Sequence, residues 1–145
     1  MENKKGFSLI ELIVAMSVFG VLLHYAVPRF RNAFEQARVN LAAANLQAVW
    51  TAQRLYWAEN GAFSSDLTTL SDAGLLDPAF ITMAANPDAR FAFGIDSSSS
   101  TTFSASAARQ NSTSWSGSVS IDQDGIVTGS VDNADGTSIE PATTF

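Results

Sequence analysis

The most prominent pattern in the chain is a run of apolar residues close to its start. After the polar stretch MENKK, the segment from Phe7 to Val27 has 21 residues, of which 16 are apolar. With a rise of about 1.5 Å per residue, a helix of this length spans roughly the ~30 Å hydrocarbon core of a bilayer. Residues 7–27 are therefore predicted to form a membrane-spanning helix.

One charged residue interrupts this run. Glu11 lies four residues beyond Phe7. An acidic side chain at the centre of a membrane costs about 2.5–3.5 kcal/mol, and less near an end, so Glu11 requires either a partner of opposite charge or a proton. The carboxylate is thus the first candidate functional group.

The helical pattern continues over residues 28–59, where apolar residues recur at spacings of three and four. One stripe consists of Phe30, Phe34, Ala37, Leu41, Ala44, Ala48, Ala52 and Leu55. A second stripe consists of Val39, Ala42, Leu46, Val49, Gln53 and Tyr56, and the polar remainder includes Arg31, Glu35 and Arg38. We expect the C-terminal part of this amphipathic helix to lie against a small domain and its N-terminal part to face other helices.

Pro28 stands between the two halves of the predicted helix. Proline removes one backbone hydrogen bond and crowds the preceding turn, so a bend or local unwinding is expected there. Gly20 is expected to soften the helix further.

Residues 60–89 are predicted to form a connecting loop with short helices. Asn60-Gly61 ends the long helix, because glycine accepts the left-handed conformation of a helix terminus. Ser64 or Ser65 is expected to cap a short helix that stops at Gly74. Asp77-Pro78 is typical of a second cap followed by a first-turn proline.

After Pro87 the period of the apolar positions changes to two. Alternation is seen around Phe91, Phe103 and Trp115, and Asp122-Gln123-Asp124-Gly125 is typical of a hairpin turn. Residues 90–131 are thus expected to form an antiparallel sheet of about four strands, and residues 132–145 a C-terminal loop. The predicted fold class is α+β, with one long N-terminal helix packed on a small antiparallel sheet.

The net charge of −6 is distributed unevenly. Residues 1–58 carry six Lys or Arg and three Glu, a balance of +3, whereas residues 59–145 carry two Arg and eleven Asp or Glu, a balance of −9. Lys4 and Lys5 precede the apolar run, which favours a cytoplasmic start and an extracytoplasmic remainder. The acidic part disfavours nucleic-acid binding, and the absence of cysteine rules out disulfides.

The sequence offers little for catalysis. It has no cysteine, no phosphate-binding glycine loop, and only one histidine, His24, which lies in the apolar run. A cysteine, serine–histidine or zinc enzyme is therefore not expected, and neither is a cofactor or a metal site. The acidic residues around Asp122 and Asp132 do not match a calcium-binding loop and are interpreted as turn residues.

The stretch from Lys5 to Val14, KGFSLIELIV, resembles the class III signal of the type IV pilin and type II secretion pseudopilin superfamily, and most of all that of a type IVa pilin. This resemblance implies that a prepilin peptidase cleaves between Gly6 and Phe7, removes residues 1–6 and methylates the new amino group of Phe7. It also implies that Glu11 pairs with the Phe7 amine of a neighbouring subunit, and that the fold is the pilin lollipop with a helix kink near Pro28.

The same resemblance implies a structural role. The chain is expected to be a bacterial inner-membrane precursor that polymerises with identical or homologous pilins into an extracellular type IV pilus, for adhesion, motility, surface sensing or DNA uptake. Its expected partners include the prepilin peptidase and the inner-membrane assembly platform. Two alternatives remain: a pseudopilin of a type II secretion system, and a monomeric membrane-anchored binding module.

Overall fold

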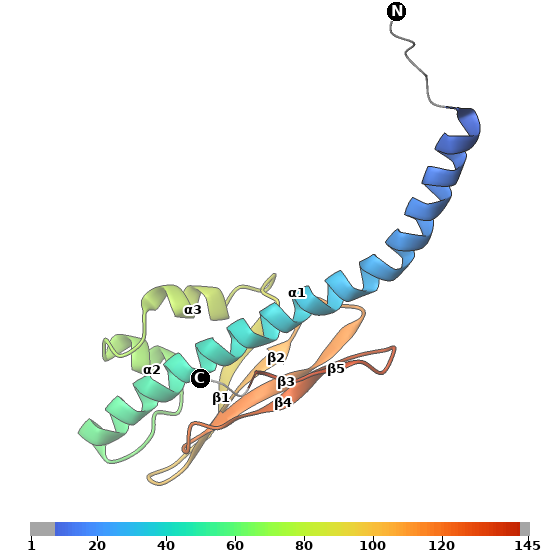
Figure 1. Cartoon of the computed structure of the whole chain (residues 1–145). Helices are drawn as coiled ribbons and strands as arrows, with labels where there is room; N and C mark the ends of the chain where they lie inside the picture. The colour runs from blue at the N-terminus through green and yellow to red at the C-terminus, as the bar shows by residue number, and fades with distance from the viewer. Residues whose placement is uncertain (1–7, 143–145) are drawn as a thin grey trace, which may run out of the picture. The chain divides into compact units, whose positions relative to one another are not determined.

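The computed structural model describes residues 8–142, which divide into two compact units between Glu35 and Gln36. Helix α1 (Leu9–Asn60) is the only regular element of the first unit within these residues, and its second part belongs to the second unit. Figure 1 shows this helix running from blue at its N-terminal end to green at its C-terminal end.

The first unit is a helix that begins directly after Ser8. The Ser8 carbonyl oxygen accepts hydrogen bonds from the backbone N–H groups of Glu11, at 3.0 Å, and Leu12, at 3.3 Å. The helix is assigned continuously through Gly20 and Pro28, so its backbone is not unwound at either residue. The bend expected at Pro28 stays a prediction.

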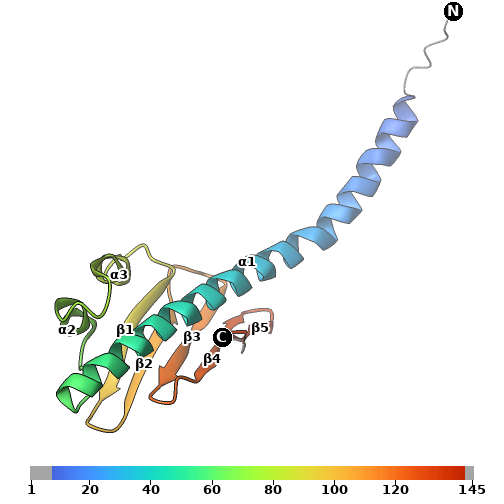
Figure 2. The same cartoon turned by 60° about the vertical axis from the view of Figure 1, so that its left-hand side comes forward.

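The second unit combines residues 36–60 of α1 with two short helices and a sheet. Its elements are α2 (Leu67–Asp72), α3 (Pro78–Ala84), β1 (Phe91–Ser98), β2 (Phe103–Arg109), β3 (Trp115–Asp122), β4 (Val127–Asn133) and β5 (Ser138–Ile139). The strands form one antiparallel sheet in the order β1-β2-β3-β4-β5, in which every strand pairs with its neighbour in sequence. Helices α2 and α3 lie beside the β1 edge of this sheet (Figures 1 and 2).

The core lies between the sheet and residues 36–60 of α1. The helix contributes Val39, Ala42, Leu46 and Val49, and the sheet contributes alternate residues of its inner face, among them Phe103, Ala105, Ala107, Val119, Ile121 and Val131. The alternation on β2 and β3 follows the period of two that the sequence shows. The α+β prediction is therefore confirmed.

Two details differ from the sequence-based expectation. The first short helix is capped by Asp66 and not by Ser64 or Ser65, because the Asp66 side chain reaches the Thr69 backbone N–H. Ser64 is buried, and its backbone is held instead by Gln53.

The segment 132–145 is also not entirely a loop. Strand β4 continues to Asn133, and β5 pairs through Val131↔Ile139 and Asp132↔Ser138. The sheet thus has five strands where about four were expected. Ile139 is buried in the core, and this one apolar anchor explains a strand too short to show a period.

Candidate assembly interface

The two residues at the predicted cleavage site, Gly6 and Phe7, lie outside the described residues. Glu11 is described, and it occupies the first turn of α1, where the positive end of the helix dipole favours a carboxylate. Its side chain is exposed. Toward the C-terminus, the first Arg or Lys is Arg29, about 27 Å farther along the helix, so no guanidinium of this helix can pair with Glu11.

The membrane half of α1 exposes its large apolar side chains over the whole surface of the helix. They are Leu9, Ile10, Leu12, Ile13, Val14, Met16, Val18, Phe19, Val21, Leu22 and Leu23. Helix α1 is also long and apolar enough to cross a membrane. A helix that is apolar on all sides requires lipid or other protein around it, because water would otherwise cover this surface.

In the second unit, the structure separates the two apolar stripes of α1. The second stripe faces the sheet, since Val39, Ala42, Leu46, Val49 and Gln53 are all buried. Most of the first stripe is exposed: Leu41 retains 63% of its accessible surface, and Ala37, Ala44 and Ala48 are also exposed. Ala52 is the exception and is buried.

The exposed stripe begins in the first unit with Phe30 and Phe34, whose side chains retain 64% and 65% of their accessible surface. Exposed phenylalanines at a spacing of four lie above one another on one helical face. They form an apolar surface on which another helix can pack.

Glu35 was assigned to the polar remainder, but only 1% of its surface is accessible. The helical phase gives the reason. Glu35 precedes Val39 by four residues and so continues the buried stripe of Val39, Ala42 and Leu46. Extending the spacing backwards along the sequence would have identified it.

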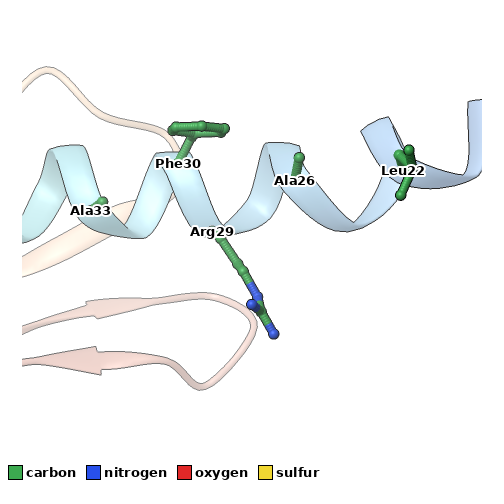
Figure 3. Close-up of a pocket in the computed structure, with 5 residues that line it drawn as sticks. All are labelled: Leu22, Ala26, Arg29, Phe30 and Ala33. Carbon is green, nitrogen blue, oxygen red and sulfur yellow. The ribbon is translucent and has the colours of Figure 1, made fainter. Parts of the chain in front are cut away.

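A shallow hollow lies on the first unit, lined by Leu22, Ala26, Arg29, Phe30 and Ala33 (Figure 3). Four of these residues have the spacing i, i+3, i+4 and i+7, which places them on one helical face. In Figure 3 the side chains of Phe30 and Arg29 point to opposite sides of the helix. The small side chains of Ala26 and Ala33 leave space along the helix surface. No residue pattern in the sequence indicated this hollow.

The remaining candidates are His24 and the acidic residues of the turns. His24 is exposed on α1, and no group of three or more metal-binding side chains comes together in residues 8–142. In the hairpin between β3 and β4, an Asp122 carboxylate oxygen accepts a hydrogen bond from the Asp124 backbone N–H at 3.0 Å. This contact is typical of a turn-forming aspartate.

Residues 1–27 match the family model for the prokaryotic N-terminal methylation motif. The match includes Gly6, Phe7 and Glu11, together with the apolar run that follows them.

Longer stretches are similar to filament and secretion proteins. The chain is 33% identical over 62 residues to the type IV major pilin protein PilA of Myxococcus xanthus, covering 43% of this chain and 28% of that protein. It is 29% identical over 85 residues to the type IV wide pilus major component PilA4 of Thermus thermophilus, covering 58% of this chain and 65% of that protein.

A further relative comes from a secretion system. The chain is 32% identical over 64 residues to the type II secretion system core protein G of Pseudomonas aeruginosa, covering 44% of this chain and 45% of that protein. In all three comparisons the chain spans less than two thirds of the relative's length. None of the three names describes an enzyme.

Proposed function

We propose that this chain, which belongs to the superfamily of type IV pilins and type II secretion pseudopilins, is a structural subunit that polymerises into a type IV pilus. The observation that carries the proposal is the combination on α1 of the methylation motif, an exposed carboxylate in the first turn and a helix surface that is apolar on all sides. Adhesion, motility, surface sensing and DNA uptake are the activities such a filament serves.

The apolar surface needs two environments in succession. As a precursor, the chain is anchored by α1 in the bacterial inner membrane, with lipid around residues 9–23. When it leaves the membrane for an extracellular filament, the same side chains must be covered by other subunits. Each large apolar side chain left in water would cost about 1.5–3 kcal/mol, so extraction is favourable only when it is coupled to packing against other copies.

Glu11 then sets the register of packing. Cleavage between Gly6 and Phe7 by the prepilin peptidase creates a new amine on Phe7, which the same enzyme methylates and which keeps its positive charge. In the apolar interior of a filament this amine and the Glu11 carboxylate of a neighbouring copy stabilise each other. An incoming subunit whose amine does not meet a carboxylate leaves both charges unpaired, which disfavours other registers.

The proposal is tested by comparing Glu11→Ala with Glu59→Ala, an exposed glutamate near the other end of the same helix. Glu11→Ala is expected to be inserted and cleaved normally but to assemble at least tenfold less filament, because an unpaired buried charge costs about 3–5 kcal/mol. Glu59→Ala should assemble normally. Sheared surface fibres, quantified against membrane-bound precursor, give the readout, and equal fibre yield from both variants contradicts the assigned role of Glu11.

A pseudopilin is the second candidate, and the similarity to the secretion core protein of P. aeruginosa favours it. Both candidates share processing and assembly on an inner-membrane platform. They differ in the product, since a pseudopilus stays short and acts in export. Deletion of the gene should abolish surface fibres and leave secretion intact for a pilin, and the reverse for a pseudopilin.

A further inference from the structure

The hollow of Leu22, Ala26, Arg29, Phe30 and Ala33 lies where the apolar run of α1 ends. From Leu9 to Val27 the helix rises about 28 Å, which is close to the thickness of a bilayer's hydrocarbon core. Arg29 follows two residues later and is the first Arg or Lys after Lys5. In the membrane-anchored state, Arg29 therefore lies at the level of the headgroups on the extracytoplasmic surface.

The charge of this segment is uniform in sign. Residues 12–34 contain Arg29 and Arg31 and no acidic residue. Arg29 is exposed, and no hydrogen bond or ion pair links it to any of residues 8–142. A guanidinium in this position matches the geometry of a phosphate group, which it can bind through two parallel N–H donors.

The rest of the hollow is apolar. Leu22 and Ala26 lie on the membrane side of Arg29, at the depth where acyl chains begin, and the Phe30 ring adds apolar surface on the other side of the helix from the guanidinium. The small side chain of Ala26 leaves space for a methylene chain on the membrane side of Arg29, and the small side chain of Ala33 leaves space for the headgroup on its other side. The hollow thus combines one anion-binding group with an apolar channel.

We propose that this hollow binds an anionic phospholipid, with the phosphate on Arg29 and the first acyl carbons along Leu22 and Ala26. A second copy of α1 is disfavoured as the occupant in the membrane, because parallel copies at the same depth would bring their arginines together. The site retains the precursor in the membrane until filament packing displaces the lipid. This inference rests only on the membrane stage of the proposed function.

The test uses the full chain in vesicles that contain phosphatidylcholine and phosphatidylglycerol in equal amounts. After release into mild detergent, native mass spectrometry counts the lipids that remain bound. We expect phosphatidylglycerol to be retained in preference to phosphatidylcholine, and Arg29→Gln to lower this preference about fivefold, which corresponds to about 1 kcal/mol of binding free energy. Arg31→Gln, which removes the same charge outside the hollow, should change it less than twofold.

A second pair of variants tests whether the lipid needs the open volume of the hollow, and it leaves the charge of Arg29 unchanged. Ala26→Trp fills the hollow, whereas Val27→Trp adds the same side chain to a neighbouring exposed position that does not line it. Ala26→Trp should lower phosphatidylglycerol retention and Val27→Trp should not. Circular dichroism of both variants confirms that the helix is intact.

Three results would overturn the site: equal losses for Arg29→Gln and Arg31→Gln, retention that is independent of the headgroup, or spontaneous disulfide dimers of Ala33→Cys, which would place a second copy in the hollow. The wild-type chain has no cysteine, so such dimers would be unambiguous. Vesicle flotation distinguishes a failure of the lipid-site proposal from a failure of the proposed function. A chain that does not float contradicts the membrane anchor, whereas one that floats without lipid preference contradicts only the hollow.

Discussion

The side-chain amide of Gln53 and the backbone of Ser64 form two reciprocal hydrogen bonds. Gln53 Nε2 donates to the Ser64 carbonyl oxygen at 2.9 Å, and the Ser64 backbone N–H donates to Gln53 Oε1 at 2.8 Å. Both residues are buried. The amide thereby takes the place of a strand partner and holds the segment after α1 against the helix.

Replacing Gln53 by leucine keeps the volume but leaves the Ser64 N–H and C=O without partners. Each buried unsatisfied group costs about 1–3 kcal/mol, so Gln53→Leu should destabilise the chain by about 2–6 kcal/mol in thermal or denaturant unfolding. Gln47→Leu is the matched control, because its amide makes only one long contact, 3.5 Å to the Gly125 carbonyl oxygen. Equal stability of the two variants would show that the Gln53 pair contributes little.

Gly125 is held in a conformation that only glycine adopts easily. Its φ is +79°, and a Cβ atom there would lie 2.9 Å from Cε2 of Trp50, whose indole N–H donates to the Gln123 carbonyl oxygen at 3.0 Å. Gly125→Ala should therefore combine about 1 kcal/mol of backbone strain with an overpacking cost of about 1–3 kcal/mol.

Gly136 separates these two effects. Its φ is +83°, but no heavy atom other than those of Gly136 and its two chain neighbours lies within 4 Å of the Cβ position. Gly136→Ala should cost only the backbone term of about 1 kcal/mol. If Gly125→Ala is no more destabilising than Gly136→Ala in thermal unfolding, the packing of Trp50 against the hairpin is not as tight as described.

Asp66 caps α2, and because its carboxylate titrates, the contribution of the cap to the stability of the folded state depends on pH. The Thr69 backbone N–H, at 2.7 Å, and then the Thr69 hydroxyl, at 2.8 Å, lower the pKa of Asp66 below its usual 3.8. Because the pKa is lower in the folded state, the stabilisation is present above the unfolded pKa and is lost as the pH falls through the folded pKa.

At pH 7, Asp66→Ala should cost about 1 kcal/mol of stability. Asp66→Asn keeps a capping oxygen that does not titrate, so its stability relative to the wild type should rise as the pH falls below about 4. Unfolding curves of the three proteins between neutral and acidic pH provide the measurement. A constant difference between wild type and Asp66→Asn over this range would contradict the account of the cap.

The side-chain amides of Asn40 and Gln36, both on α1, form hydrogen bonds with the backbone of the C-terminal segment at Glu140 and Ala142. Asn40 Oδ1 accepts from the Ala142 backbone N–H at 3.1 Å and from Gln36 Nε2 at 3.0 Å, while Gln36 Nε2 also donates to the Glu140 carbonyl oxygen at 2.9 Å. Asn40→Ala should accelerate hydrogen exchange of the Ala142 amide at least tenfold and reduce global stability by less than about 1 kcal/mol. Asn40→Asp keeps the acceptor and should restore the protection of the Ala142 amide. Unchanged exchange in Asn40→Ala would show that the hydrogen bond to Asn40 does not protect this amide.

The sequence predicts the fold well where the pattern is long or chemically specific. The long helix ends at Asn60, as Asn60-Gly61 indicates, and Asp77 with Pro78 begins α3 as predicted. Alternation on β2 and β3 places Phe103 and Val119 in the core. In these cases each residue's local preference agrees with the packing around it.

The sequence was less informative where tertiary packing, and not residue type, determines burial, strand formation or the choice of a helix cap. The burial of Glu35 depends on the phase of the helix and not on polarity, and β5 is too short to show a period. Ser64, Ser65 and Asp66 are all acceptable caps by residue type, and Asp66 is the cap because α2 begins at Leu67, which brings the Asp66 side chain to the Thr69 backbone N–H. The processing site stays a prediction, since Gly6 and Phe7 lie outside the described residues.

The central claim is that the chain works as a processed subunit of a filament assembled through α1. The most direct test is mass spectrometry of fibres sheared from the cell surface, after electron microscopy has shown that they are filaments. The account predicts that the fibres contain this chain, beginning at an N-methylated Phe7 and lacking Met1 to Gly6. A chain found only in the membrane fraction, with the first six residues still attached, would contradict it.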